Sequence, residues 1–175
     1  VEIACALLFL CNYVTFGFTM NFFISTIITC SLMITIVSDF LYFYISDRVL
    51  ILSGIAIIVI LLIFETPEVV FKHIIAATVI FILMYLIKLL GNAIFRKESL
   101  GDGDIKLMGI VGLSIGIMNS LVALFIASVV GLLFSCIITK KNKEGIIPFG
   151  PFLLIGALIT LYFSDIITPI LQVYF

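Results

Sequence analysis

Two aspartates that border separate apolar runs are the residues of this chain best suited to chemistry. Asp39 closes one long apolar run, and Asp104 opens another as the last residue of Gly101-Asp102-Gly103-Asp104. Carboxylates in or beside a bilayer cost free energy, so they are retained mainly where they perform a function. Two membrane-embedded acids on separate segments are the minimum equipment for hydrolysing a peptide bond within a membrane.

Hydrolysis by two carboxyl groups requires that they hold different protonation states. One ionised acid activates water and one protonated acid polarises the scissile carbonyl, and the pair shares a proton because two like charges at close range do not both ionise easily. Asp39 and Asp104 suit these roles because they come from different segments that can converge. The sequence does not assign which is the base, and this chemistry demands neither a metal nor another cofactor.

The residues around Asp104 support this interpretation. Gly101 and Gly103 lack side chains, so the backbone can bend there and a substrate can approach closely. A helix that begins near Asp104 would present free amide groups near that acid, and we expect Asp102 to face water. Lys106 has two open interpretations: an electrostatic neighbour of the acid pair, or an interface anchor that extends to the lipid headgroups.

The composition excludes a water-soluble globular domain, because 64% of the residues are hydrophobic, 11% are charged and the mean hydropathy is +1.43. The apolar runs are continuous rather than alternating, which predicts helices and not barrel strands. We therefore expect one all-α domain over residues 1–175, a polytopic transmembrane helix bundle of six or seven spans with a tight turn at Met118-Asn119-Ser120. The seven runs are Ile3–Phe16, Asn21–Val37, Val49–Phe64, Val70–Leu90, Leu100–Met118, Ser120–Thr139 and Pro148–Phe163.

The basic residues predict the orientation of these spans. Only Lys72, of the nine Lys and Arg residues, falls on one side of the seven-span arrangement. The side that carries the others should face the cytoplasm, and Asp39 and Asp104 fall there too. The net charge of −1 and the lack of a basic tail give no indication of nucleic-acid binding. The residues on the basic side are Arg48, Lys88, Arg96, Lys97, Lys106, Lys140, Lys141 and Lys143.

The remaining special residues predict packing rather than chemistry. The four cysteines lie singly in apolar runs and His73 is the one histidine, so we expect no metal site. Gly112-x-x-x-Gly116 fits close packing of helices in lipid. The chain begins with Val1 rather than Met, and we expect it to be the C-terminal part of a longer protein.

Two motifs resemble those of the aspartic prepilin peptidases, membrane enzymes that cleave the leaders of type IV prepilins. Gly101-Asp102-Gly103-Asp104 followed by Ile-Lys-Leu looks like the second catalytic motif of that family. Asp39 lies six residues before Ile45-Ser46-Asp47, which resembles the first motif, an Asp followed at that spacing by Ile-Pro-Asn or Leu-Pro-Asp. Ser46 replaces the usual proline, which makes the start of the following helix less rigid.

Two further blocks resemble the bacterial branch of the family. Residues 147–153 are similar to its last-helix signature, and residues 1–9 resemble the segment that follows its cytoplasmic insertion. Pro148 and Pro151 should open the last helix, since proline is tolerated in a first turn. This opening falls on the side of the acid pair, so Pro148, Gly150 and Pro151 are candidates for gating the substrate.

The resemblance implies an intramembrane aspartic endopeptidase of the bacterial cytoplasmic membrane, with its active site at the cytoplasmic face. It implies Asp39 and Asp104 as the catalytic pair and a prepilin or pseudopilin as substrate. Bacterial members often also carry an upstream domain with two C-x-x-C pairs that is implicated in N-methyl transfer. This chain has no C-x-x-C pair, so methyl transfer is expected only in a longer form.

Two other classes of function fit an acid pair in a membrane. A small transporter would use Asp39 and Asp104 as proton or cation ligands, and it would have broken helices near mid-membrane and internal repeats. A non-catalytic assembly protein would hold pilin subunits in the membrane, and changing either Asp to Asn would then be harmless.

Overall fold

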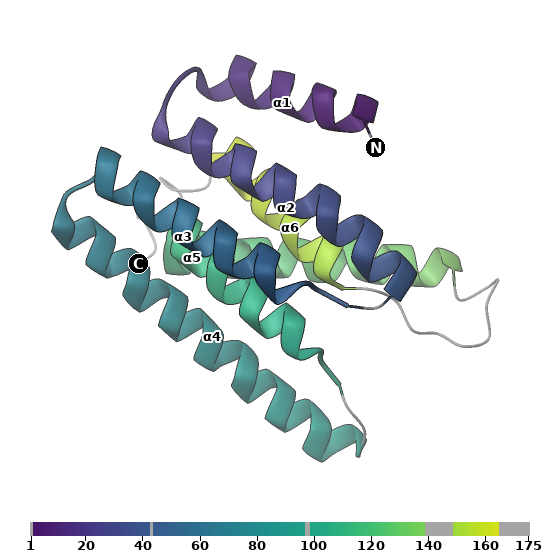
Figure 1. Cartoon of the computed structure of the whole chain (residues 1–175). Helices are drawn as coiled ribbons and strands as arrows, with labels where there is room; N and C mark the ends of the chain where they lie inside the picture. Colours follow the sequence, from purple (N-terminus) through teal and green to yellow (C-terminus); the bar gives the residue numbers. More distant parts are fainter. Residues whose placement is uncertain (1, 43, 97–98, 139–148, 165–175) are drawn as a thin grey trace.

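The structure, a computed structural model, describes residues 2–42, 44–96, 99–138 and 149–164. These residues form helices and connections, with no β-strand in any of the four ranges. The predicted all-α fold is therefore confirmed (Figure 1). The helices are α1 (Glu2–Phe16), α2 (Met20–Tyr42), α3 (Asp47–Phe64), α4 (Pro67–Phe95), α5 (Asp102–Ile138) and α6 (Gly150–Tyr162).

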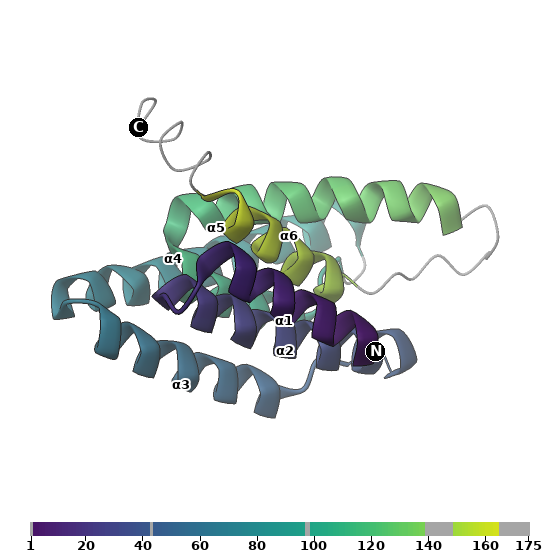
Figure 2. The ribbon, with the colours of Figure 1, turned by 90° about the horizontal axis from the view of Figure 1, so that it is seen from above.

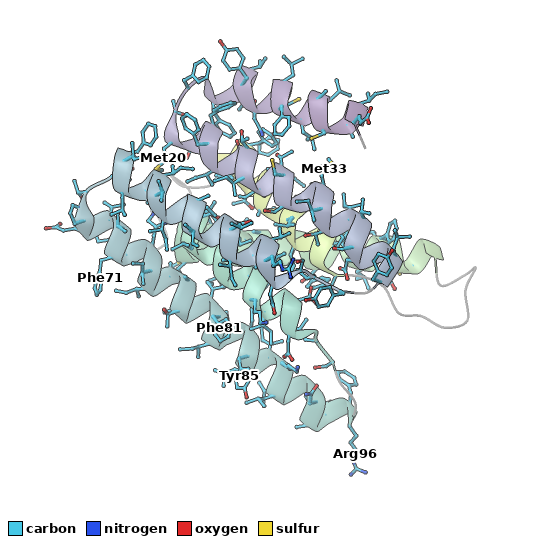
Figure 3. The ribbon with its side chains drawn as sticks, viewed as in Figure 1. Met20, Met33, Phe71, Phe81, Tyr85 and Arg96 are labelled. Carbon is cyan, nitrogen blue, oxygen red and sulfur yellow. The ribbon has the colours of Figure 1, made fainter. Side chains whose placement is uncertain are left out.

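Helices α2 to α5 are long and apolar enough to cross a membrane, whereas α1 and α6 are shorter apolar helices. Aromatic residues of α4 show the character of this surface: Phe71, Phe81 and Tyr85 are 63%, 42% and 48% exposed, and Figure 3 shows them along that helix. Large exposed apolar side chains are compatible with a lipid solvent and unfavourable in water. The predicted polytopic helix bundle thus agrees with the structure.

Helix α5 contains a sharp break at Gly116, where φ is 77° and ψ is 177°. Glycine adopts this left-handed region readily because it has no Cβ. The two halves of α5 run in different directions from the break, and the second half lies beside α6 (Figure 2). The chain therefore does reverse between the fifth and sixth predicted spans, but the prediction of a turn at Met118-Asn119-Ser120 was wrong because the glycine supplies it earlier.

The two glycines of the G-x-x-x-G pattern have different roles. A Cβ at Gly112 would lie 3.0 Å from the carbonyl oxygen of Ala76 and 3.1 Å from Cα of Ala77, so this glycine permits close packing of α5 on α4. A Cβ at Gly116 would meet nothing within 4 Å. The prediction of close packing is correct for Gly112 and wrong for Gly116, whose function in the fold is the break itself.

His73 of α4 stabilises this break. Its Nδ1 lies 2.8 Å from the carbonyl oxygen of Leu113, and since a carbonyl only accepts, Nδ1–H is the donor. The break at Gly116 displaces the amides that would otherwise bond to the last carbonyls of the first half of α5, as at any helix C-terminus. His73 supplies a donor to one of these carbonyls, which gives the lone histidine a structural role.

The helix order brings the ends of several helices together at one end of the bundle. Helices α2 and α4 end there, and α3, α5 and α6 begin there (Figure 1). Helix α6 packs against both α2 and α5, and α5 packs along α4. This end, called the acid-pair end below, carries Asp39 and Asp104.

The described basic residues are distributed as the sequence predicts. Arg48 lies in the first turn of α3, Lys106 near the start of α5 and Lys88 toward the end of α4, all at the acid-pair end. Arg96 directly follows α4 at the same end (Figure 3). Lys72 lies near the start of α4, at the opposite end. The remaining predicted basic residues, Lys97, Lys140, Lys141 and Lys143, are outside the described residues.

A buried polar cluster joins α1 to the rest of the bundle at the opposite end. Asn12, which is fully buried, donates from Nδ2 to the hydroxyl of Thr29 on α2 at 3.2 Å and accepts from the hydroxyl of Tyr162 on α6. The rings of Phe16 and Tyr162 stack with their centroids 5.5 Å apart. Hydrogen bonds of this kind stabilise contacts between helices in lipid, where apolar packing alone gives little specificity.

We predict that His73→Phe destabilises the folded protein by about 1–3 kcal/mol, because it leaves a buried carbonyl without its donor. Unfolding of the purified protein in mixed micelles with increasing denaturing detergent measures the loss. Glu68→Gln, on the exposed face of the same helix, is the control and should leave the midpoint unchanged. Equal midpoints for His73→Phe and the parent would contradict the role assigned to this histidine.

Candidate active site

The structure brings Asp39 and Asp104 together at the acid-pair end. Asp39 lies near the end of α2 and Asp104 in the first turn of α5, and they are only 6% and 9% exposed. Their charges are close enough to interact, and both residues line one cavity of about 350 Å³. Two carboxyls that face a shared, partly open cavity can act together on a bound molecule.

Gly101 makes room for the Asp104 carboxyl. The carboxyl lies beside the backbone amide of Gly101. A Cβ at position 101 would lie 3.3 Å from Oδ2 of Asp104, tighter than most real contacts. The glycine expected to allow a close backbone approach therefore does so toward the acid itself.

Gly150 plays the corresponding part for Asp39. The Asp39 carboxyl lies beside the backbone amide of Gly150, the first residue of α6. A Cβ at Gly150 would lie 2.9 Å from Oδ2 of Asp39 and 3.2 Å from Cγ2 of Thr35, so a side chain cannot be placed there without a shift. Helix α6 can approach the acid only because its first residue is glycine.

Oδ2 of Asp39 has no hydrogen-bond partner among the residues that the structure describes, although it is buried. Buried polar atoms are nearly always paired, because an unpaired one loses its hydration without compensation. An exception in a carboxyl that faces a cavity is typical of a group that exchanges protons or contacts a ligand. The same carboxyl is one of the two that the sequence singles out.

Two ion pairs lie at the rim of the cavity. Nζ of Lys106 is 2.7 Å from Oδ1 of Asp47, and Nζ of Lys88 is 2.6 Å from Oδ1 of Asp102. Lys106 thus has its own acidic partner on α3, next to the acid pair. The Asp102 side chain is 74% exposed, which agrees with the expectation that it faces water.

Helix α6 begins at Gly150 with Pro151 in its first turn, as the sequence predicts. Pro151 is buried, in a helix that packs against both α2 and α5. Pro148 lies outside the described residues. Gating by Pro148, Gly150 and Pro151 therefore stays a prediction.

Ile45 and Thr35 lie close to the acids, which the sequence did not predict: Thr35 was not singled out, and Ile45 was named only as part of the first motif. Thr35 precedes Asp39 by one helical turn and is 2% exposed. Positions four apart share a helix face, so this neighbour of Asp39 was open to prediction. Ile45 lies in the connection between α2 and α3, where no periodicity predicts which way a side chain points.

The fold and the site together define a class: a bundle of membrane-length helices with two buried carboxyls facing one cavity at an end of the bundle. Residues 26–136 match the model of the type IV leader peptidase family. This match covers more than half of the chain, including both Asp39 and Asp104, and the chain therefore belongs to that family.

Curated relatives are similar to parts of the chain. A type 4 prepilin-like proteins leader peptide-processing enzyme of Escherichia coli O78:H11 is 35% identical over 82 residues, which cover 47% of this chain and 30% of that protein. Proteins named prepilin leader peptidase/N-methyltransferase are 38% identical over 72 residues in Legionella pneumophila and 35% identical over 75 residues in Aeromonas salmonicida. These alignments cover 39% and 41% of this chain and 25% and 26% of those proteins. No solved structure matches the chain.

We predict that Ser46→Pro stabilises the protein by about 0.4–1 kcal/mol, since it restricts the unfolded chain. Ser46 is the N-cap of α3 with φ of −70°, a value that the proline ring also imposes, and its side chain makes no capping hydrogen bond. The unfolding midpoint in mixed micelles tests this. The matched change Ser128→Pro, inside α5, should instead destabilise strongly, and a loss of stability from Ser46→Pro would contradict the prediction.

Proposed function

We propose that this chain is an intramembrane aspartic endopeptidase that removes the leader peptide of a type IV prepilin or pseudopilin. One observation carries the proposal: Asp39 and Asp104, on different helices, are both buried and line one cavity. Family membership supports the substrate class, because the relatives are named for processing prepilin leaders. The aligned parts cover less than a third of those relatives.

The proposed reaction is hydrolysis by a shared general acid and base. One ionised carboxyl takes a proton from water, whose oxygen forms a bond to the scissile carbonyl carbon, while the protonated partner donates to the carbonyl oxygen. In the second step the carbon–nitrogen bond breaks, and the leaving amine takes the proton held by the first carboxyl. The hydroxyl proton of the intermediate returns to the second carboxyl, so both acids regain their starting states.

The distribution of charge supports a cytoplasmic active site in a bacterial inner membrane. Four of the five described basic residues lie at the acid-pair end, the arrangement typical of a cytoplasmic face. A prepilin substrate carries a short basic leader on that side, followed by an apolar helix. The bond to be cut then lies at the depth of the cavity, and the end of the substrate helix must become extended, because helical peptide bonds are shielded by their own hydrogen bonds.

The proposal is limited to peptide cleavage. Two of the relatives are also named for N-methyl transfer. The sequence motifs of this chain match only the peptidase part of the resemblance, so the proposal does not extend to methyl transfer.

We predict that Asp39→Asn and Asp104→Asn each lower leader cleavage by at least about a thousandfold, because neither amide can transfer the required proton. Cleavage of a co-expressed prepilin in matched membranes measures this, with protein levels equalised by immunoblot. Asp102→Asn is the matched comparison: the same change two residues from Asp104, in an exposed side chain paired with Lys88. It should retain cleavage.

The outcomes separate the candidate functions. If the parent cleaves the prepilin and either the Asp39→Asn or the Asp104→Asn variant cleaves it equally well, the substituted Asp takes no part in the mechanism. If the parent and both variants support pilus assembly equally without cleavage, the chain acts as an assembly protein. If the parent takes up a proton or cation, both variants abolish this uptake and no cleavage is seen, the chain is a transporter.

We predict that cleavage continues unchanged after treatment with EDTA or 1,10-phenanthroline, because two carboxyls and water are sufficient for the reaction. The assay uses the purified protein in detergent with a prepilin peptide, and the chelator is removed by dialysis afterwards. Loss of activity that returns when a particular metal is added would show that a metal takes part.

A further inference from the structure

At the acid-pair end, Ile45 lies where the connection between α2 and α3 meets the starts of α5 and α6. It lies in the non-helical connection that joins α2 to α3 and is 8% exposed. It lines the same cavity as Asp39 and Asp104. A buried aliphatic side chain at this position does no chemistry, so its role must come from what it touches.

On one side Ile45 packs against the start of α5. A Cβ built on Gly103 would lie 3.0, 3.3 and 3.2 Å from Cβ, Cγ1 and Cδ1 of Ile45. The Ile45 side chain therefore fills the space that a side chain at position 103 would need. Since Gly103 directly precedes Asp104, this contact fixes how far the backbone that carries Asp104 can approach α2.

On its other side Ile45 packs against the start of α6. A Cβ built on Gly150 would lie 2.8 Å from Cδ1 of Ile45 and 2.9 Å from Oδ2 of Asp39. One methyl group of Ile45 and one carboxyl oxygen of Asp39 thus both border the same glycine. The position of α6 against Ile45 is therefore coupled to the position of the Asp39 carboxyl.

We propose that Ile45 is a positioning residue: its side chain is a spacer between Gly103 and Gly150 that sets the separation of the Asp39 and Asp104 carboxyls. The contacts with two glycines, one adjacent to each acid, carry this proposal. Side chains in packed interiors sit in fixed rotamers with few voids, so loss of one methyl group is transmitted to the neighbouring backbone. The consequence for catalysis rests on the proposed peptidase function, whereas the geometric role does not.

The first test measures the separation directly, without any activity. Asp39→Cys and Asp104→Cys are introduced into full-length protein in which Cys5, Cys11, Cys30 and Cys136 are replaced by Ala. Dibromobimane, which fluoresces once it links two thiols, is added to membranes and the rate of linking is recorded. Ile45→Val, which removes the Cδ1 methyl, should change this rate by on the order of threefold or more, because the second step depends on the local thiol concentration.

Ile24→Val is the matched control. It removes the same methyl group from a fully buried isoleucine of α2 that does not line the acid-pair cavity. Its linking rate should equal that of the parent. Equal rates for Ile45→Val and the parent, or equal changes for the two variants, would overturn the proposal, because the effect would then be absent or general to core packing.

A double substitution tests the contact itself. In the protein that carries Asp39→Cys and Asp104→Cys, the Cβ added by Gly150→Ala still meets Cδ1 of Ile45 at 2.8 Å, its nearest contact, and Ile45→Val removes that methyl group while Cγ2 of Thr35 stays in place. The linking rate should therefore lie closer to that of the parent in the double variant than in Gly150→Ala alone. If the changes in linking rate caused by Ile45→Val and Gly150→Ala simply add in the double variant, the two residues do not share a contact, since only coupled sites depart from additivity.

The second test measures cleavage in the chain that retains both aspartates. Ile45→Val should lower kcat by about tenfold while KM stays within about twofold, because misplacing catalytic groups costs rate more than binding. Altered linking with unaltered kcat would show that the separation is not catalytically important and would overturn the catalytic part. Altered linking in a protein that cleaves no prepilin would support the spacer and count against the proposed function.

Discussion

The burial of two carboxyl groups beside each other is the constraint on which the rest of this structure depends. A carboxylate that leaves water loses hydration free energy, and a second one nearby adds repulsion unless a proton is shared. Asp39 and Asp104 are 6% and 9% exposed, and one oxygen of Asp39 has no partner among the described residues. The surrounding packing has to supply the free energy that holds the pair in place.

Glycine makes that packing possible. Gly150 lies against the Asp39 carboxyl at a distance that excludes a Cβ without a shift, and a Cβ at Gly101 would be tight against the Asp104 carboxyl. The same residue type at Gly112 lets α5 approach α4, and at Gly116 it reverses the chain. Each of these positions requires either a missing side chain or a positive φ, and together they direct α5 and α6 to the acid pair.

The two ends of the bundle are stabilised by different interactions, ion pairs at one end and buried hydrogen bonds at the other. At the acid-pair end, ion pairs such as Lys106–Asp47 lie at a partly exposed rim, where water screens them. At the opposite end, Asn12 and His73 make hydrogen bonds that are largely shielded from solvent. These bonds join α1 to α2 and α6 and α4 to α5, so hydrogen bonds connect the helices at the far end, whereas the rim at the acid-pair end is charged and partly exposed.

The sequence by itself determined the all-α membrane fold, and it singled out the two acids and the glycines next to Asp104 as candidate site residues. Both are local features, because an apolar run or an isolated charge can be recognised without knowing which residues it contacts. It also predicted that Pro151 opens the last helix. It misplaced the reversal in α5, because Gly116 was interpreted as a packing glycine, whereas its positive φ and the hydrogen bond from His73 of α4 are set by the folded chain. Only the tertiary structure decided that Gly150 touches Asp39 and that Ile45 lies between two glycines. Such contacts join residues far apart in the chain, so no local sequence pattern predicts them.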